Sequence, residues 1–172
     1  NAYLTTRETR KEVGYSATKS LNQTKSFLDY KSVYSKEIVN ILAANTELQR
    51  ILKKDLASYQ ADIGNWSLDR DNLYKAVFAS KTNPDIKEIK IYMDHGPAAA
   101  FESSSLYTMD TFHSLFVNPE DEFKAASIRW LKGSSLKDSS STEDIILLKG
   151  IVDSSNYKRN IGISRLDFDA NV

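Results

Sequence analysis

The stretch Asp144-Ile-Ile-Leu-Leu-Lys-Gly-Ile-Val-Asp-Ser-Ser-Asn-Tyr-Lys-Arg-Asn-Ile-Gly-Ile-Ser-Arg-Leu-Asp-Phe-Asp169 holds two runs of mainly branched and aliphatic residues around a polar loop. This pattern predicts two antiparallel strands joined by a turn, near 144–153 and 160–169. In the second run the apolar residues change face partway along, which is typical of a central strand covered on both sides or of a bulged strand. Gly150 and Gly162 lie inside the runs, where the missing side chain permits a bulge or a close backbone approach. We expect this hairpin to form the core of a sheet.

Three further strands are expected upstream of the hairpin. The β-branched run at 86–93 predicts the first, and the turn residues Asp94-His95-Gly96-Pro97 close it. The second is expected at 98–103, and the third at 127–132. A short helix from Met109 to Phe116 separates the second strand from the third. The sequence therefore predicts an α+β fold, in which long N-terminal helices precede a PAS-like five-stranded antiparallel sheet.

The N-terminal part reads as helix. Residues 5–54 contain no proline and one glycine, and apolar residues recur at spacings of three and four. Two apolar stripes result: Val13, Ala17, Leu21, Thr24 and Leu28, then Ile38, Ile41, Leu42, Leu48, Ile51 and Leu52. Thr46 and Gln49 have capping-box spacing, so the helix is expected to be interrupted near Asn45-Thr46-Glu47. This region is either a helix packed on its own domain or a dimerising stalk, and the stripes fit both.

A second helix is expected after a turn at residues 56–65. It starts near Asn65 and ends before Pro84, because proline disfavours helix at the residue before it. Its inward-facing residues are expected to be Trp66, Leu73, Val77 and either Tyr74 or Phe78.

Composition narrows the class of protein. The chain has 172 residues, 41% of them hydrophobic, which is enough to build a core. Lys plus Arg and Asp plus Glu both total 23, and a neutral chain argues against a nucleic-acid binder. There is no cysteine, so disulfides and thiol chemistry are excluded. No apolar run approaches the ~20 residues that a membrane helix needs.

Three segments are expected along the chain. Asn1-Ala2 resembles the remnant of a cleaved expression tag. Residues 3–57 are expected to form an N-terminal helical stalk, and residues 58–172 a PAS-like sensor module. A start near Tyr3 suggests that a signal peptide or a membrane helix lies upstream in the parent protein.

Three stretches carry a resemblance to a known family. They are Asn45-Thr-Glu-Leu-Gln-Arg-Ile-Leu52, the run at 86–93 with Asp94-His95-Gly96, and Asn160-Ile-Gly-Ile-Ser-Arg-Leu-Asp-Phe168. They resemble the helix before the sheet, the first strand and the last strand of extracellular Cache sensor domains in Gram-positive two-component histidine kinases. The resemblance implies a ligand-sensing domain outside the cell membrane, flanked by membrane helices and paired as a homodimer in the full-length receptor. Many such kinases carry a second Cache module, which would begin near Val172.

One departure from the family concerns its ligand. Cache domains that bind amino acids resemble one another in an Arg-x-Trp-Tyr signature in the short helix after the second strand. Here that helix reads Met109-Asp-Thr-Phe-His-Ser-Leu-Phe116, without Arg or Trp. Core packing explains most of the aromatic residues of this region, and a ligand cleft would use the same residues with one or two polar groups to orient a solute. The candidate ligand-binding residues are Tyr92, Phe101, Tyr107, Phe112, Arg129, Trp130 and Lys149.

Catalytic and metal motifs are missing from the sequence. His95 and His113 have no His or Cys at metal-ligand spacing, and no Gly-x-Ser-x-Gly elbow, phosphate loop or dinucleotide glycine pattern occurs. We therefore expect no catalytic residue, no metal and no cofactor. The expected function is ligand sensing for a membrane-bound histidine kinase. The alternatives are the sensor domain of a chemoreceptor and a protein–protein interaction domain without a small-molecule ligand; a hydrolase comes third.

Overall fold

The structure is a computed structural model that describes residues 14, 18–19, 22, 29, 31–81, 83–93, 105–122 and 128–169. The chain divides into two compact units, residues 1–37 and residues 38–172. In the first unit every described residue is helical. The predicted stripe of Val13, Ala17, Leu21, Thr24 and Leu28 lies outside the described residues.

Four helical segments open the second unit. Residues 38–44 are helical, and α2 (Thr46–Lys53), α3 (Leu56–Ala61) and α4 (Ile63–Ser80) follow. The predicted interruption is present, but its cap is Asn45 rather than Thr46, since the Asn45 side chain accepts a hydrogen bond of 2.9 Å from the amide of Leu48.

The turn predicted for residues 56–65 is wrong. Asp55 caps α3 by accepting a 3.0 Å hydrogen bond from the amide of Ser58. Asp62 then accepts a 2.9 Å hydrogen bond from the amide of Gly64 at the start of α4. Two capping aspartates thus allow one short helix and the start of a longer one where the sequence was interpreted as a turn.

Five strands form one mixed sheet in the order β2-β1-β5-β4-β3. Their bounds are β1 Ile86–Met93, β2 Leu106–Thr108, β3 Ile128–Lys132, β4 Ile145–Asp153 and β5 Asn156–Phe168. The predicted strands at 86–93, 127–132, 144–153 and 160–169 match four of these within a few residues, while the range 98–103 lies outside the described residues.

The β1–β2 pair corrects the prediction of an antiparallel sheet. β2 runs parallel to β1, with Ile91 paired with Leu106 and Tyr92 with Tyr107. A tight hairpin can join only antiparallel strands, and twelve residues separate the end of β1 from the start of β2. The β1–β5, β5–β4 and β4–β3 pairs are antiparallel, as expected.

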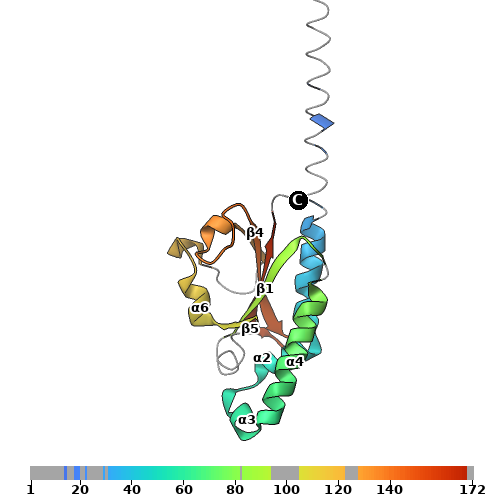
Figure 1. Ribbon diagram of the computed structural model, residues 1–172, viewed down its shortest axis with the longest axis vertical. Coiled ribbons are helices and arrows are strands. Elements are labelled where there is room, and N and C mark those ends of the chain that lie inside the picture. The colour runs from blue at the N-terminus through green and yellow to red at the C-terminus, as the bar shows by residue number, and fades with distance from the viewer. Residues whose placement is uncertain are drawn as a thin grey trace, which may run out of the picture. The chain divides into compact units, whose positions relative to one another are not determined.

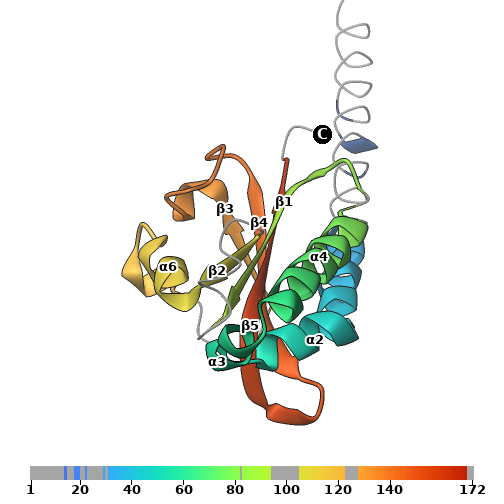
Figure 2. The same cartoon turned by 60° about the horizontal axis from the view of Figure 1, so that its bottom comes forward.

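Helices lie on both faces of this sheet (Figures 1 and 2). On one face α2 approaches β5 so closely that a Cβ at Gly162 would lie 3.6 Å from Leu52. The opposite face carries α6 (Met109–Ser114), whose Phe112 packs with Tyr92 and Ile163 in one hydrophobic cluster. Residues 161–168 of β5 are all buried. The prediction of a central strand covered on both sides is therefore confirmed.

The burial of the helical residues confirms most of the residues predicted to face inward and corrects two of them. Ile38, Leu42, Leu48, Ile51, Leu52, Leu73 and Val77 are buried as predicted. Ile41 is 64% exposed and Tyr74 is 59% exposed, so neither belongs to the core. Trp66 is half-buried, with the Arg70 guanidinium 4.8 Å from the centre of its ring.

Candidate functional site

A buried arginine on β5 is the centre of the candidate site. Arg165 points to the α6 face and has no exposed side-chain surface. Its Nε lies 2.7 Å from Oδ1 of Asp167, and its Nη2 lies 2.8 Å from Oδ2. The two residues are two positions apart on one strand, so their side chains share a face and form a bidentate ion pair.

The rest of the guanidinium meets a loop and the neighbouring strand. Nη1 of Arg165 lies 2.8 Å and 3.0 Å from the two carboxylate oxygens of Asp138, and it donates a 3.1 Å hydrogen bond to the Tyr92 hydroxyl. Lys90 is paired across the strands with Arg165, and its Nζ lies 2.8 Å from Oδ2 of Asp138. Two cations from adjacent strands therefore converge on one loop carboxylate.

The loop between β3 and β4 fixes the position of Asp138. It begins with the 3-10 turn η3 (Gly133–Ser135), where a Cβ at Gly133 would overlap the carbonyl oxygen of Ser141. The amide of Lys137 donates a 2.8 Å hydrogen bond to the carbonyl of Leu115, which follows α6. Leu136 is buried against Phe116. The loop is thus attached to the end of α6 as well as to the sheet.

Electrostatics at the site follow from burial and pairing. Burial alone would raise the pKa of Asp138, but hydrogen bonds from Lys90 and Arg165 outweigh it and lower that pKa. Burial raises the pKa of Tyr92 despite the positive charge of Arg165 nearby, so the phenol stays neutral. Burial also raises the pKa of Asp167, and the bidentate pair with Arg165 opposes this rise.

Three of the predicted ligand-binding residues come together on the α6 face. The ring centres of Tyr92 and Phe112 are 4.9 Å apart, and those of Tyr92 and Tyr107 are 5.8 Å apart. Tyr107 also lies beneath Lys90, whose Nζ is 5.4 Å from the centre of its ring. These aromatic side chains form an apolar wall beside the charged group.

The other predicted residues do not join them. Arg129 is on the same face, but its guanidinium donates a 2.6 Å hydrogen bond to the carbonyl of Asp121. Trp130 lies on the opposite face against Phe168, with ring centres 6.4 Å apart. Lys149 is on that opposite face too and donates to Asn40. Phe101 lies outside the described residues.

The sequence prediction missed the four charged residues of the site, Lys90, Asp138, Arg165 and Asp167. A signal for two of them was present, because Arg165 and Asp167 alternate with apolar residues inside a strand that was predicted to be buried on both faces. Charges in such a strand must be paired. No comparable signal marked Asp138, which lies in a Ser-rich loop.

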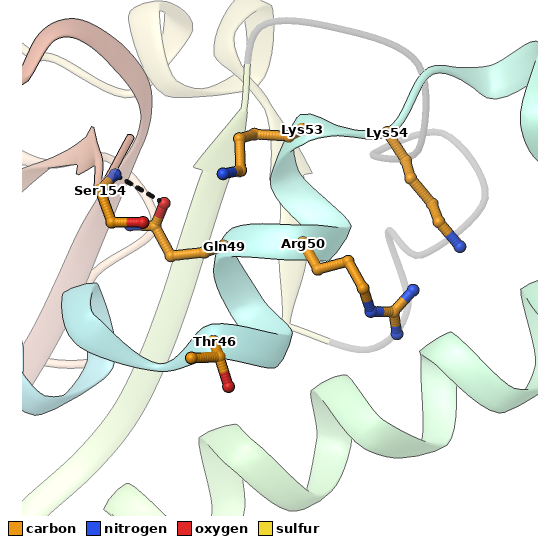
Figure 3. Close-up of a pocket in the computed structure, with 6 residues that line it drawn as sticks. All are labelled: Thr46, Gln49, Arg50, Lys53, Lys54 and Ser154. Atoms are coloured by element: carbon orange, nitrogen blue, oxygen red, sulfur yellow. Dashed lines mark hydrogen bonds between the residues drawn. The ribbon is translucent and has the colours of Figure 1, made fainter. Parts of the chain in front are cut away.

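A separate basic pocket of about 420 Å³ lies between α2 and the β4–β5 turn. Figure 3 shows its lining residues Thr46, Gln49, Arg50, Lys53, Lys54 and Ser154. The Lys53 amine points toward the Ser154 side, whereas Arg50 and Lys54 extend the opposite way (Figure 3).

The cations of this pocket are already paired. Asp69 is 2.8 Å from Nζ of Lys54 and forms an ion pair with Arg50, and Asp153 is 3.2 Å from Nζ of Lys53. Burial would raise the pKa of Asp69, but hydrogen bonds from Arg50, Lys54 and Tyr59 outweigh it and lower that pKa to about 2. Because these cations diverge (Figure 3), whereas Lys90 and Arg165 converge on one carboxylate, this pocket is a weaker candidate than the Arg165 site.

Metal chemistry finds no support among the described residues. Within ranges 31–81, 83–93, 105–122 and 128–169, no three His, Cys, Asp or Glu side chains lie close enough to hold a metal ion. His113 forms an ion pair with Glu122. His95 lies outside the described residues.

Comparison with known proteins does not identify a family for this chain. No family model, curated protein or solved structure matches the chain. In the part of the chain that the structure describes, no helix combines the length and the apolar character needed to cross a membrane.

Proposed function

We propose that residues 38–172 form an extracellular ligand-sensing module of the Cache type, in a membrane-bound sensor histidine kinase. Residues 38–57 belong to this module because α2 packs on β5 with Leu48, Ile51 and Leu52 buried, and the residues before 38 act as the helical stalk that passes the signal across the membrane. Long helices, five strands and a short helix after the second strand follow one another along the chain, in the order that the sequence resemblance implies.

The observation that carries this proposal is the convergence of Arg165 and Lys90 on Asp138. A buried ion pair contributes little net stability, because desolvation costs about as much as the attraction returns. Groups whose pKa values are shifted by burial and by charged partners cluster at functional sites, and Tyr92 and Asp138 are such groups here. Here they also lie beside aromatic side chains, as in a pocket that orients a small solute.

A signal can leave the site through the loop. A ligand shifts a receptor between two states only as far as it binds them with different affinity. The loop of Asp138 is hydrogen-bonded to Leu115, the residue after α6, and this bond connects a change in the contacts of Asp138 to α6. In this proposal the domain itself has no catalytic role, and the kinase activity belongs to the parent protein. The parent protein forms a homodimer, and membrane helices flank the sensor domain in its chain.

Two experiments test the proposal. The first screens the chain for saturable thermal stabilisation by a panel of neutral, cationic and anionic solutes, because a ligand at 100 times its dissociation constant stabilises by about 2.7 kcal/mol. The second inserts the chain between the membrane helices of a histidine kinase and measures autophosphorylation with and without the stabilising solute. A solute that stabilises the chain and changes autophosphorylation supports the proposal.

Two other results would replace it. Coupling to a chemoreceptor output but not to a kinase output would favour the chemoreceptor alternative. No stabilisation by any solute, together with an unresponsive chimera, would favour a protein-interaction domain.

A further inference from the structure

We propose that Lys90 and Arg165 form the anion-binding half of the sensory site, and that Asp138 closes it in the ligand-free protein as a built-in carboxylate. The ligand is then a small organic acid whose carboxylate takes the place of Asp138. This inference rests on the proposed sensory function, which it makes more specific.

The shape of the position occupied by Asp138 indicates the class of ligand. Beyond its Cα, an aspartate side chain has the atoms of acetate, a CH₂ group and a carboxylate. Both of its oxygens contact Nη1 of Arg165, at 2.8 Å and 3.0 Å, and one contacts Nζ of Lys90 at 2.8 Å. A free carboxylate could make the same contacts, since charge-assisted hydrogen bonds join guanidinium and ammonium groups to carboxylates.

The order of burial shows how a solute would enter. The side chain of Asp138 is 29% exposed, that of Lys90 is 11% exposed and that of Arg165 is 0% exposed. Asp138 is therefore the outermost member of the group, and its departure would open the two cations to solvent. Asp167 holds the far side of Arg165 with two hydrogen bonds, so the guanidinium would keep its orientation.

The exchange has a favourable charge balance. Removing Asp138 without replacement would leave the two cations with the buried carboxylate of Asp167 and with Glu88, which is 48% exposed and 3.7 Å from Lys90, so positive charge at the buried position would be poorly compensated, and this is destabilising. Replacing it with another carboxylate keeps the net charge of the group unchanged. Competition with a tethered carboxylate also weakens the apparent affinity, because the apparent dissociation constant is the intrinsic one divided by the open fraction of the protein.

The neighbouring side chains offer the acid a hydroxyl and an aromatic ring. The Tyr92 hydroxyl lies 3.1 Å from Nη1 of Arg165 and can donate its own proton to a ligand oxygen. The centre of the Tyr107 ring lies 5.4 Å from Nζ of Lys90 and 5.8 Å from the centre of the Tyr92 ring. An acid with a hydroxyl or keto oxygen beside its carboxylate could accept the proton of Tyr92 as well as pair with the two cations.

The test compares the wild-type chain with Asp138→Ala and with a matched control, Asp144→Ala. Asp144 lies at the other end of the same loop and pairs with Lys87 at 2.8 Å, so its loss also removes a lysine–aspartate pair. Each protein is titrated with sodium acetate, sodium pyruvate, sodium phosphate and sodium chloride at constant ionic strength, and its thermal midpoint is recorded. If Asp138→Ala does not fold, Asp138→Asn replaces it.

The expected result has three parts. Acetate or pyruvate raises the wild-type midpoint saturably, beyond the effect of chloride and phosphate. Asp138→Ala reaches half-saturation at an acid concentration at least about tenfold below that of the wild type, because the internal competitor is gone. Asp144→Ala keeps the wild-type half-saturation.

Several results would overturn the inference. A response in Asp138→Ala but not in the wild type would make Asp138 a permanent structural counter-ion. Equal half-saturation in wild type and Asp138→Ala would place binding elsewhere, and an equal response to phosphate would make the site unselective for carboxylates. If neutral solutes stabilise the wild type while the acids do not, this inference fails and the sensory function stands.

Discussion

Arg165 and Asp167 form a bidentate ion pair along a single strand, and their side chains are 0% and 4% exposed. Nε and Nη2 of the arginine lie 2.7 Å and 2.8 Å from the two carboxylate oxygens. Since successive side chains of a strand alternate between faces, a spacing of two residues is what allows the pair to form. On the α6 face of β5 this charged pair therefore lies next to Ile163, which belongs to the hydrophobic cluster.

Asp167→Asn is expected to destabilise the protein by about 3 to 5 kcal/mol, since it leaves the buried guanidinium with one carboxylate fewer. Urea unfolding measures this loss. The double variant Arg165→Met/Asp167→Leu should lose less than Asp167→Asn alone, because it removes both desolvated charges while Asp138 keeps Lys90. Glu88→Gln is the control: Glu88 is 48% exposed and 3.7 Å from Lys90, and its loss should be barely measurable. A double variant that is less stable than the single one would show that the pair is a net stabiliser.

Gly162→Ala is expected to destabilise the protein by about 1 to 3 kcal/mol, as in overpacked cores. An added Cβ would lie 2.7 Å from the carbonyl oxygen of Tyr92 on β1, so the two central strands would have to separate. Gly14→Ala is the contrasting variant, because a Cβ there meets nothing within 4 Å and alanine favours helix over glycine by about 1 kcal/mol, so it should not destabilise. Chemical denaturation of both variants decides the point. Equal stabilities would mean that β1 and β5 can separate at little cost.

The pKa of Asp69 predicts an acid-sensitive contribution to stability. That pKa is about 2 in the folded protein against a usual value of 3.8, so the folded state favours the ionised form. The stabilisation is complete above about pH 4 and is lost as the pH falls toward 2; it amounts to about 2 kcal/mol. The difference in unfolding free energy between wild type and Asp69→Asn should therefore shrink by that amount between pH 5 and pH 2.

The control for this titration is Asp71→Asn. Asp71 is 61% exposed and lies 3.8 Å from Arg70, so its replacement should leave the pH dependence of the wild type intact. A pH-independent difference between wild type and Asp69→Asn would show that the carboxylate of Asp69 is not responsible.

The strands were largely predictable because their signal is local. The β-branched run at 86–93 matches β1 at both ends, and the hairpin of β4 and β5 follows from two apolar runs around a polar loop. The direction of β2 was not predictable, since the apolar and aromatic pattern of Leu106 and Tyr107 suits a parallel and an antiparallel neighbour of β1 equally. The helix α3 was missed because Asp55 and Asp62, which cap it and α4, were not read as capping residues.

The site was predictable in its apolar part only. Tyr92, Tyr107 and Phe112 belong to elements adjacent in the fold, and aromatic content was a sufficient signal for them. The ion pairs join residues 27 and 48 positions apart in the chain, Arg165 with Asp138 and Lys90 with Asp138. The sequence alone does not indicate which cation an aspartate in a loop, such as Asp138, will pair with. The sequence also did not predict on which face of the sheet Trp130 and Lys149 lie, because this depends on the register between β3 and β4.

Gln49 is expected to hold α2 to the β4–β5 turn. It is buried, and its amide nitrogen donates hydrogen bonds of 2.7 Å and 2.8 Å to the carbonyls of Ala43 and Val152, while its oxygen accepts a 3.1 Å bond from the amide of Ser154. Gln49→Leu keeps the volume but leaves three backbone groups without this partner. Each orphaned buried group costs about 1 to 3 kcal/mol, and water entering from the adjacent basic pocket will offset part of the sum.

We therefore expect Gln49→Leu to lose about 2 to 4 kcal/mol of unfolding free energy. The more specific readout is hydrogen exchange at the Ser154 amide, which should accelerate well beyond the change that the lower global stability explains. Thr46→Ala is the control, because Thr46 lines the same pocket on the same helix but is exposed. It should leave exchange at Ser154 unchanged. If Gln49→Leu speeds exchange equally at Ser154 and throughout β5, then Gln49 stabilises the whole fold and does not specifically hold the turn.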